Sequence, residues 1–135
     1  MKKGVLGATD ITDFGLARHA QNLSIRLGAS GCCLDLSSLP LLDGALTLFS
    51  SGRKSSLHDQ NRAAVQIDSS GLSGYSGARF DVHVEALFDP QTSGGLLGVV
   101  PRDTANRLVA SLHKGGQTAA IIGTLDFTNA GIHLT

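Results

Sequence analysis

The spacing of hydrophobic residues predicts three helices. The first covers about residues 13–27, where apolar positions recur at intervals of four, three and four residues: Leu16, Ala20, Leu23 and Leu27. Gly28 is expected to end it. A second helix is expected after Ser37-Ser38-Leu39-Pro40, which contains capping residues and a first-turn proline, and should reach about Phe49. The third covers residues 103–114 and carries one apolar stripe: Ala105, Leu108, Val109 and Leu112.

Most of the other apolar segments have the length and alternation of strands. We expect strands at residues 31–36, 63–67, 80–84, 85–88, 96–100, 118–125 and 131–134. The continuous apolar run at 96–100 is typical of a central strand. Two polar stretches, 53–61 and the serine- and glycine-rich 68–77, are predicted to be loops, the second exposed and mobile. The whole pattern predicts an α/β (α+β) fold with helices packed on one side of a mixed sheet.

Composition narrows the class of protein. A chain of 135 residues with 41% hydrophobic residues is expected to form a single domain over residues 1–135. Lys and Arg together number 11, and Asp and Glu also number 11, so no net charge favours nucleic acid as a partner. No apolar run is long enough for a membrane span, and the stretch after Met1 is too short for a signal peptide. We therefore expect a cytoplasmic protein.

The two cysteines, Cys32 and Cys33, are adjacent in a predicted strand. Successive side chains of a strand point to opposite faces, so these thiols are not placed to bridge each other. No C-x-x-C spacing or nearby set of ligands suggests redox or metal chemistry. We interpret both as thiols packed in a strand.

Acidic and hydroxyl residues are concentrated in the segment just before the first helix. Ala8-Thr9-Asp10 is expected to form a turn, followed by Thr12 and Asp13. A carboxylate at this place has two possible roles. It can cap the free N–H groups of the helix and interact with its dipole, or Asp10 can project outward and bind Mg²⁺, which proteins hold with one or two carboxylates plus substrate phosphates.

A second candidate is the loop Asp89-Pro90-Gln91-Thr92-Ser93-Gly94-Gly95. Its glycines and hydroxyls resemble a phosphate-binding loop, but it has no G-K-[ST] and leads into a predicted strand instead of a helix. One interpretation is a structural turn in which Pro90 fixes φ and the glycines allow another backbone to approach closely. The other is direct contact with a substrate.

The remaining polar residues show no strong catalytic pattern. Ser55-Ser56-Leu57-His58 and Asn61-Arg62 lack the spacing of a catalytic triad, and no His, Cys or Glu set has zinc spacing. His19 is close in sequence to the Asp10 turn, but a partly buried helix histidine is the simpler interpretation.

Residues 8–16, A-T-D-I-T-D-F-G-L, resemble the A-T-D-[IV]-T-G-F-G-L motif of selenophosphate synthetase, also called selenide, water dikinase. Further segments resemble the C-terminal half of that family in the same order: Leu39-Pro40, Gly44-Ala45, the stretch from Ser56-Leu57-His58 to Asn61-Arg62, L-F-D-P-Q-T-S-G-G-L-L at 87–97, and Ile121-Ile122-Gly123. The resemblance covers nearly the whole chain, and D-P-Q-T-S-G-G-L-L is its most specific part.

The resemblance implies the C-terminal domain of a two-domain, AIR-synthetase-like ATP-binding enzyme that often forms homodimers. Such an enzyme transfers a phosphoryl group from ATP to selenide and yields selenophosphate, AMP and phosphate. Its nucleophile and most of its magnesium-binding acids belong to an N-terminal catalytic domain. The implied partner is that domain, the implied cofactor is Mg²⁺ with ATP, and no catalytic residue is expected in this chain.

The resemblance also implies roles for individual residues. Asp10 matches an acid similar in role to a magnesium ligand, with Thr9 and Thr12 near the nucleotide phosphates. Asp13 departs from the family pattern, which has glycine there; its side chain is expected to oppose a tight turn and its charge to repel phosphates. Cys32 and Cys33 do not match the family's nucleophile. The alternative hypotheses are a non-catalytic oligomerisation or partner-binding module, or a related enzyme acting on a purine precursor or thiamin monophosphate.

Overall fold

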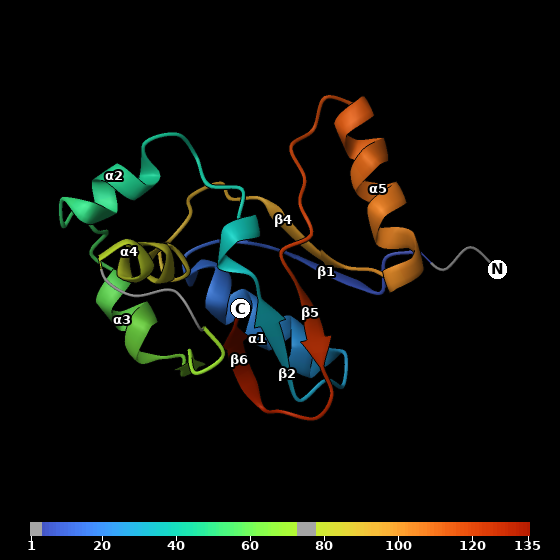
Figure 1. Cartoon of the computed structure of the whole chain (residues 1–135), viewed down its shortest axis with the longest axis horizontal. Coiled ribbons are helices and arrows are strands. Elements are labelled where there is room, and N and C mark those ends of the chain that lie inside the picture. The colour runs from blue at the N-terminus through green and yellow to red at the C-terminus, as the bar shows by residue number, and fades with distance from the viewer. Residues whose placement is uncertain (1–3, 73–77) are drawn as a thin grey trace.

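The structure is a computed structural model that describes residues 4–72 and 78–135, with only the backbone for 78–81. Five helices and six strands alternate irregularly along this part of the chain (Figure 1). The strands are β1 (Gly7–Asp10), β2 (Gly31–Leu34), β3 (Ile67–Asp68), β4 (Leu96–Val99), β5 (Gly123–Asp126) and β6 (Gly131–Leu134). The helices are α1 (Gly15–Arg26), α2 (Ala45–Ser50), α3 (His58–Ala63), α4 (Ala78–Ala86) and α5 (Arg102–Lys114), with a 3₁₀ turn at Leu36–Ser38.

The strands form two separate sheets. Four of them are ordered β3-β6-β2-β5, with β2 parallel to β6 and antiparallel to β5. β1 and β4 form an antiparallel pair of their own, in which Asp10 lies opposite Leu96. The expected mixed sheet is therefore confirmed, and the paired β1 and β4 extend beside it.

The core lies between the four-stranded sheet and α1. Small residues of α1, Ala17 and Ala20, are buried, which allows the helix to approach β2 and β6 closely. Further buried hydrophobic side chains come from the inner strands, the 3₁₀ turn and the segment after α4: Leu34, Leu36, Leu87, Phe88, Ile132 and Leu134. α2, α3 and α4 gather at one end of the molecule, and α5 lies at the other (Figure 1).

The prediction of two strands at 80–84 and 85–88 is wrong, because this segment contains α4. Its buried residues Val84, Leu87 and Phe88 are spaced at i, i+3 and i+4, which is the repeat of a helix face. The predicted loop at 53–61 and strand at 63–67 are also corrected. Residues 58–63 form α3, and the strand is limited to β3.

Several boundaries differ from the predictions. The expected turn at Ala8-Thr9-Asp10 is the strand β1, and the expected central strand at 96–100 is β4, which pairs only with β1 among the described strands. The second helix starts later than expected, after Gly44, whose φ of 83° is left-handed. The expected capping serines belong instead to the 3₁₀ turn, where Asp35 accepts a hydrogen bond from the Ser37 N–H at 2.9 Å. The strand expected at 118–125 is reduced to β5.

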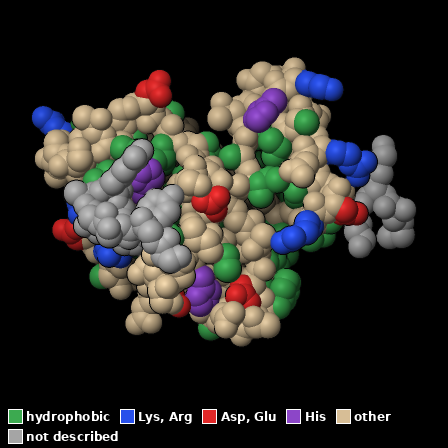
Figure 2. All heavy atoms as spheres, in the orientation of Figure 1, with side chains coloured by type: hydrophobic (Ala, Val, Ile, Leu, Met, Phe, Trp, Pro, Cys, Tyr) green, Lys and Arg blue, Asp and Glu red, His purple; other side chains and the backbone are tan. Residues whose placement is uncertain are grey.

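The prediction of α5 is confirmed in position but not in burial. The helix ends at Gly115, as expected, yet none of its residues is buried. Leu108 and Leu112 of the predicted stripe are 38% and 37% exposed. The apolar face of α5 is therefore only partly covered by the described residues, and hydrophobic side chains are visible beside this helix in Figure 2.

Both cysteines lie on β2, as expected. Cys32 is buried and Cys33 is half-buried, and neither is in a disulfide. Burial raises the pKa of both thiols, which disfavours the reactive thiolate.

Within residues 4–72 and 78–135, no helix is long and apolar enough to cross a membrane.

Candidate functional site

The structure brings the two predicted motifs together. The Ile11 N–H donates to the Gly95 carbonyl at 3.0 Å, and the Gln91 N–H donates to the Thr12 carbonyl at 3.1 Å. These bonds continue the β1–β4 pairing past the end of the strands. We call the two joined segments, residues 8–12 and 89–95, the motif junction.

Two glycines permit this close arrangement. A Cβ on Gly94 would collide with the carbonyl oxygen of Ile11, so the loop approaches the strand end with backbone alone. Gly15 has φ +70°, and a Cβ there would lie 2.8 Å from the Leu87 carbonyl oxygen. The first turn of α1 is fixed at the same place, because the Ala17 N–H donates to the Leu87 carbonyl at 2.9 Å. One glycine of each motif, Gly15 and Gly94, thus serves close backbone packing.

Thr12 is held from several directions. Its N–H donates to Nε2 of His19 at 3.1 Å, and its hydroxyl lies 3.2 Å from the same nitrogen. Nε2 thus acts as the acceptor of this backbone N–H. His19 is half-buried, as the sequence suggested, and it orders the motif junction through Thr12.

Asp10 differs from Thr12 in having no partner. It is exposed at the end of β1, and its carboxylate makes no hydrogen bond or ion pair with any residue in 4–72 or 78–135. The capping interpretation is not supported: α1 begins at Gly15, and its N-cap Phe14 has no side-chain cap. Asp10 therefore presents free carboxylate oxygens next to the loop 89–95.

Asp13 is compatible with the turn that it was expected to oppose. Among the described residues, no residue other than glycine has a positive φ, and Gly15 provides the left-handed conformation. The Asp13 side chain is exposed. The glycine-to-aspartate difference therefore leaves the backbone of this turn unstrained.

The loop 89–95 has a half-buried start and an exposed tip. Burial raises the pKa of the Asp89 carboxyl, opposed by the charge of His58 and by a hydrogen bond from Gln91 Nε2 at 3.1 Å. Thr92 and Ser93 are exposed, and their hydroxyls bond to no residue that the structure describes. Free hydroxyls and one free carboxylate thus lie on the two sides of the motif junction.

The residues of the motif junction fit one part of a magnesium site. No group of three or more His, Cys, Asp or Glu side chains in the described ranges could enclose a metal ion. A single exposed carboxylate without a partner matches the way Mg²⁺ is held, by one or two carboxylates while phosphates and water complete the octahedron. Asp10 can supply that share, and other ligands must come from outside the described residues.

The sequence analysis missed a charged cluster around Glu85. Lys54 Nζ and His58 Nε2 each lie 2.6 Å from Glu85 Oε2, and Arg62 Nε lies 3.3 Å from Oε1. Burial alone would raise the pKa of Glu85, but hydrogen bonds from Lys54 and His58 and the charges of Lys54 and Arg62 hold it below its usual range. His58 and Arg62 are four residues apart on α3, a spacing that was a signal of one shared helical face, and Lys54 comes from the segment before that helix.

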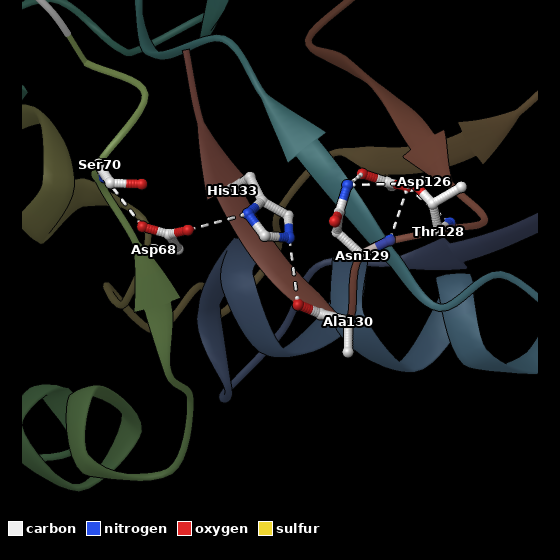
Figure 3. Close-up of polar contacts among 7 residues, drawn as sticks. All are labelled: Asp68, Ser70, Asp126, Thr128, Asn129, Ala130 and His133. Atoms are coloured by element: carbon white, nitrogen blue, oxygen red, sulfur yellow. Dashed lines mark hydrogen bonds and ion pairs between the residues drawn. The ribbon is translucent and has the colours of Figure 1, made fainter.

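A second polar region lies across β3, β6 and the β5–β6 turn (Figure 3). The carboxylate of Asp126 accepts hydrogen bonds from Thr128 and Asn129, whose N–H groups lie 2.8 and 3.0 Å away. His133 lies between Asp68, at 3.3 Å, and the Ala130 carbonyl, at 3.1 Å. A hollow of about 380 Å³ adjoins this region, lined by Gln21, Gln66, Ile67, Asp68, Ala130, Gly131 and Ile132. None of the predicted site residues lines it.

The fold agrees with comparisons to known proteins. Residues 1–131 match the family described as "AIR synthase related protein, C-terminal domain", and the chain belongs to this family. Thiamine-monophosphate kinase from Stenotrophomonas maltophilia has the same fold, with a TM-score of 0.60 and 15% identity over 96% of this chain and 31% of that one.

The expected resemblance to selenophosphate synthetase is also confirmed. The chain is similar to a selenide, water dikinase of Porphyromonas gingivalis, 41% identical over 129 residues that cover 90% of the chain and 34% of the relative. It is similar to those of Carboxydothermus hydrogenoformans, at 35% identity over 90% and 34%, and a Shewanella species, at 38% over 92% and 33%. The chain thus spans about a third of the length of these curated relatives.

Proposed function

We propose that this chain acts as the C-terminal domain of a selenophosphate synthetase-type enzyme. Its role is to supply Asp10 to a site for Mg²⁺ and the phosphates of ATP, which an N-terminal catalytic domain completes. The proposal rests on one observation above all: Asp10 is exposed and without a partner among the described residues, although the backbone around it is fixed by hydrogen bonds. The similarity to selenide, water dikinases supplies the reaction class.

The division of roles follows from the geometry. Asp10 provides a carboxylate oxygen to the cation, and the exposed hydroxyls of Thr92 and Ser93 are available to phosphate oxygens. Thr9 and Thr12 flank Asp10, and the bonds of Thr12 to His19 and Gln91 fix this segment before any ligand binds. Mg²⁺ supplies neutralisation of the charge that develops on the phosphoryl oxygens. Under this proposal the nucleophile belongs to the N-terminal domain, and the chain is expected to be inactive alone.

Asp10→Asn is the direct test. Binding of Mg²⁺–ATP is measured by calorimetry after addition of the N-terminal domain of a selenide, water dikinase relative. We expect the affinity to fall by about tenfold to a hundredfold, which is the range for loss of a group that supports a bound metal. The melting temperature should not change, because the Asp10 side chain makes no hydrogen bond or ion pair with the described residues.

Asp13→Asn is the matched control. It removes one negative charge, as Asp10→Asn does, from another exposed side chain that lies three residues further along the chain. A specific metal contact predicts that Asp13→Asn reduces affinity far less than Asp10→Asn. Equal losses would show a general charge effect, and no loss in either variant would remove the proposed role of Asp10.

A second candidate function is a non-catalytic module that binds a partner or a second copy of itself. The observation in its favour is α5, whose apolar stripe is only partly covered. Leu108→Asp combined with Leu112→Asp should then abolish association in sedimentation experiments. Under this alternative, Asp10→Asn changes no measured property of the complex.

A further inference from the structure

Asn61 lies on α3 and contacts the two residues that flank the motif junction, one next to each of its segments. Its side-chain nitrogen Nδ2 donates to the Asp13 carbonyl at 2.8 Å and to the Phe88 carbonyl at 3.1 Å. The residue is only 6% exposed. These two bonds connect three segments that are 48 and 27 residues apart in sequence.

The two carbonyl groups define what this side chain must be. A carboxamide carries two N–H donors on one nitrogen, and both are used here by acceptors on different segments. Since both neighbours are carbonyl oxygens, the NH₂ end must face them. A carboxylate would place negative charge against two acceptors, and a hydroxyl could satisfy only one of them.

The two carbonyl groups that accept from Asn61 lie next to the two segments of the motif junction. Asp13 directly follows Thr12, and Phe88 directly precedes Asp89, so Asn61 fastens the outer end of each motif segment. The bond from the Gln91 N–H to the Thr12 carbonyl joins the same segments on the inner side. Asn61 thus closes a ring of contacts that fixes the distance between the Asp10 strand end and the loop 89–95.

We propose that Asn61 is a positioning residue: it sets the placement of Asp10 relative to the 89–95 loop and so prepares the phosphate-binding geometry. This inference rests on the proposed function. Asn61 touches neither the cation nor the phosphates and acts through the backbone of Asp13 and Phe88. The neighbouring Glu85 also contacts α3, through His58 and Arg62.

The first test is hydrogen exchange in the chain itself. Asn61→Leu keeps the size of the side chain and removes both donors. We expect the amides of Ile11 and Gln91 to exchange about tenfold faster, while the amides that pair β2 with β6 keep their protection. If Asn61→Leu fails to fold, Asn61→Ser, which keeps one donor, should show faster exchange at the same two amides but by a smaller factor. A uniform increase over all amides, or no increase, would overturn the inference.

The second test measures Mg²⁺–ATP affinity with the same supplied N-terminal domain. Asn61→Leu should weaken it about tenfold, and a higher Mg²⁺ concentration should restore it only partly. Ser24→Ala is the control, because Ser24 is equally buried and donates to the Ala20 carbonyl at 2.8 Å, within α1 and away from the motif junction. It should lower the melting temperature without changing the affinity.

The two tests separate the inference from the proposed function. If Asp10→Asn weakens Mg²⁺–ATP binding and Asn61→Leu does not, the proposed function stands and the positioning role is wrong. If Asp10→Asn has no effect, the proposed function is wrong, and the positioning role falls with it.

Discussion

The motif junction and the β5–β6 turn both present a carboxylate, and each is followed by a glycine of positive φ, Gly15 and Gly131, yet the two carboxylates are used differently. Asp126 accepts hydrogen bonds from the N–H groups and side chains of Thr128 and Asn129, so its oxygens are occupied by its own turn (Figure 3). The Asp10 carboxylate accepts none from the described residues, while the backbone of Ile11 and Thr12 beside it is hydrogen-bonded to the loop 89–95. An acid that organises its own loop has a structural role, whereas one kept free on an ordered backbone is available to an external cation.

The largest expected difference concerns the two glycines. Gly15→Ala should cost about 3 kcal/mol or more, because it adds the strain of a left-handed φ to a collision with the backbone of Leu87 and Phe88. Gly131→Ala should cost only about 1–2 kcal/mol, since its φ of +89° is strained but no atom lies within 4 Å of the added Cβ. Urea unfolding of both variants measures the two costs.

Equal losses of unfolding free energy in Gly15→Ala and Gly131→Ala would contradict the expected difference between the two glycines. They would mean that the motif junction relaxes to accept a methyl group. Gly52→Ala, with φ +77° and open space around it, provides a third value for strain without collision.

The two histidines should differ by a smaller amount. His19→Leu removes the acceptor of the Thr12 N–H and is expected to lower stability by about 1 kcal/mol, mostly as a local loss of protection at Thr12. His19→Gln, which keeps an acceptor, should recover part of this loss. His133→Leu should change stability less, since His133 contacts groups at the surface. A larger effect at His133 in thermal unfolding would contradict this ranking.

The smallest expected effect is on the dependence of stability on acidic pH. Backbone and side-chain hydrogen bonds from Asn129, followed by those from Thr128, hold the pKa of Asp126 well below its ordinary value. A carboxyl whose folded pKa is lowered stabilises the fold above its unfolded pKa of about 3.9, and this contribution is lost as pH falls through the folded value. Asp126→Asn should therefore make stability less steep with pH below about 4. An unchanged slope in urea unfolding would show that the turn does not hold the carboxylate in solution.

Regular helices and the glycine-rich motifs could be predicted from sequence, and their long-range partners could not. α1 and α5 were found because their apolar positions follow a helical repeat over three turns or more. α4 was missed because Phe80, Val82 and Val84 alternate like a strand, while the helical spacing of Val84, Leu87 and Phe88 lies at its end. Short α3 lacks an apolar stripe, since its buried residues are the polar His58 and Asn61.

The candidate site was predicted in the same partial way. Asp10 and the loop 89–95 stood out by residue type, and their resemblance to one family placed them in one enzyme. The hydrogen bonds between the Asp10 segment and the loop 89–95 depend on the pairing of β1 with β4, which are more than 80 residues apart in sequence. No local sequence pattern predicts such a pairing. Asn61 was noted as part of a polar stretch, but its donors act on two distant carbonyl groups.

The register of β1 against β4 limits how this part of the chain can change in length. Leu97 packs against the core, while its neighbour Leu96 is 77% exposed. Because side chains alternate along a strand, one residue inserted between Gly95 and Leu96 would exchange these faces as long as the loop stays bonded to Ile11 and Thr12. The loop before β4 is therefore restricted in its number of residues as well as their identity, and insertions are better tolerated in the turn at 127–130, which is exposed and pairs with neither sheet.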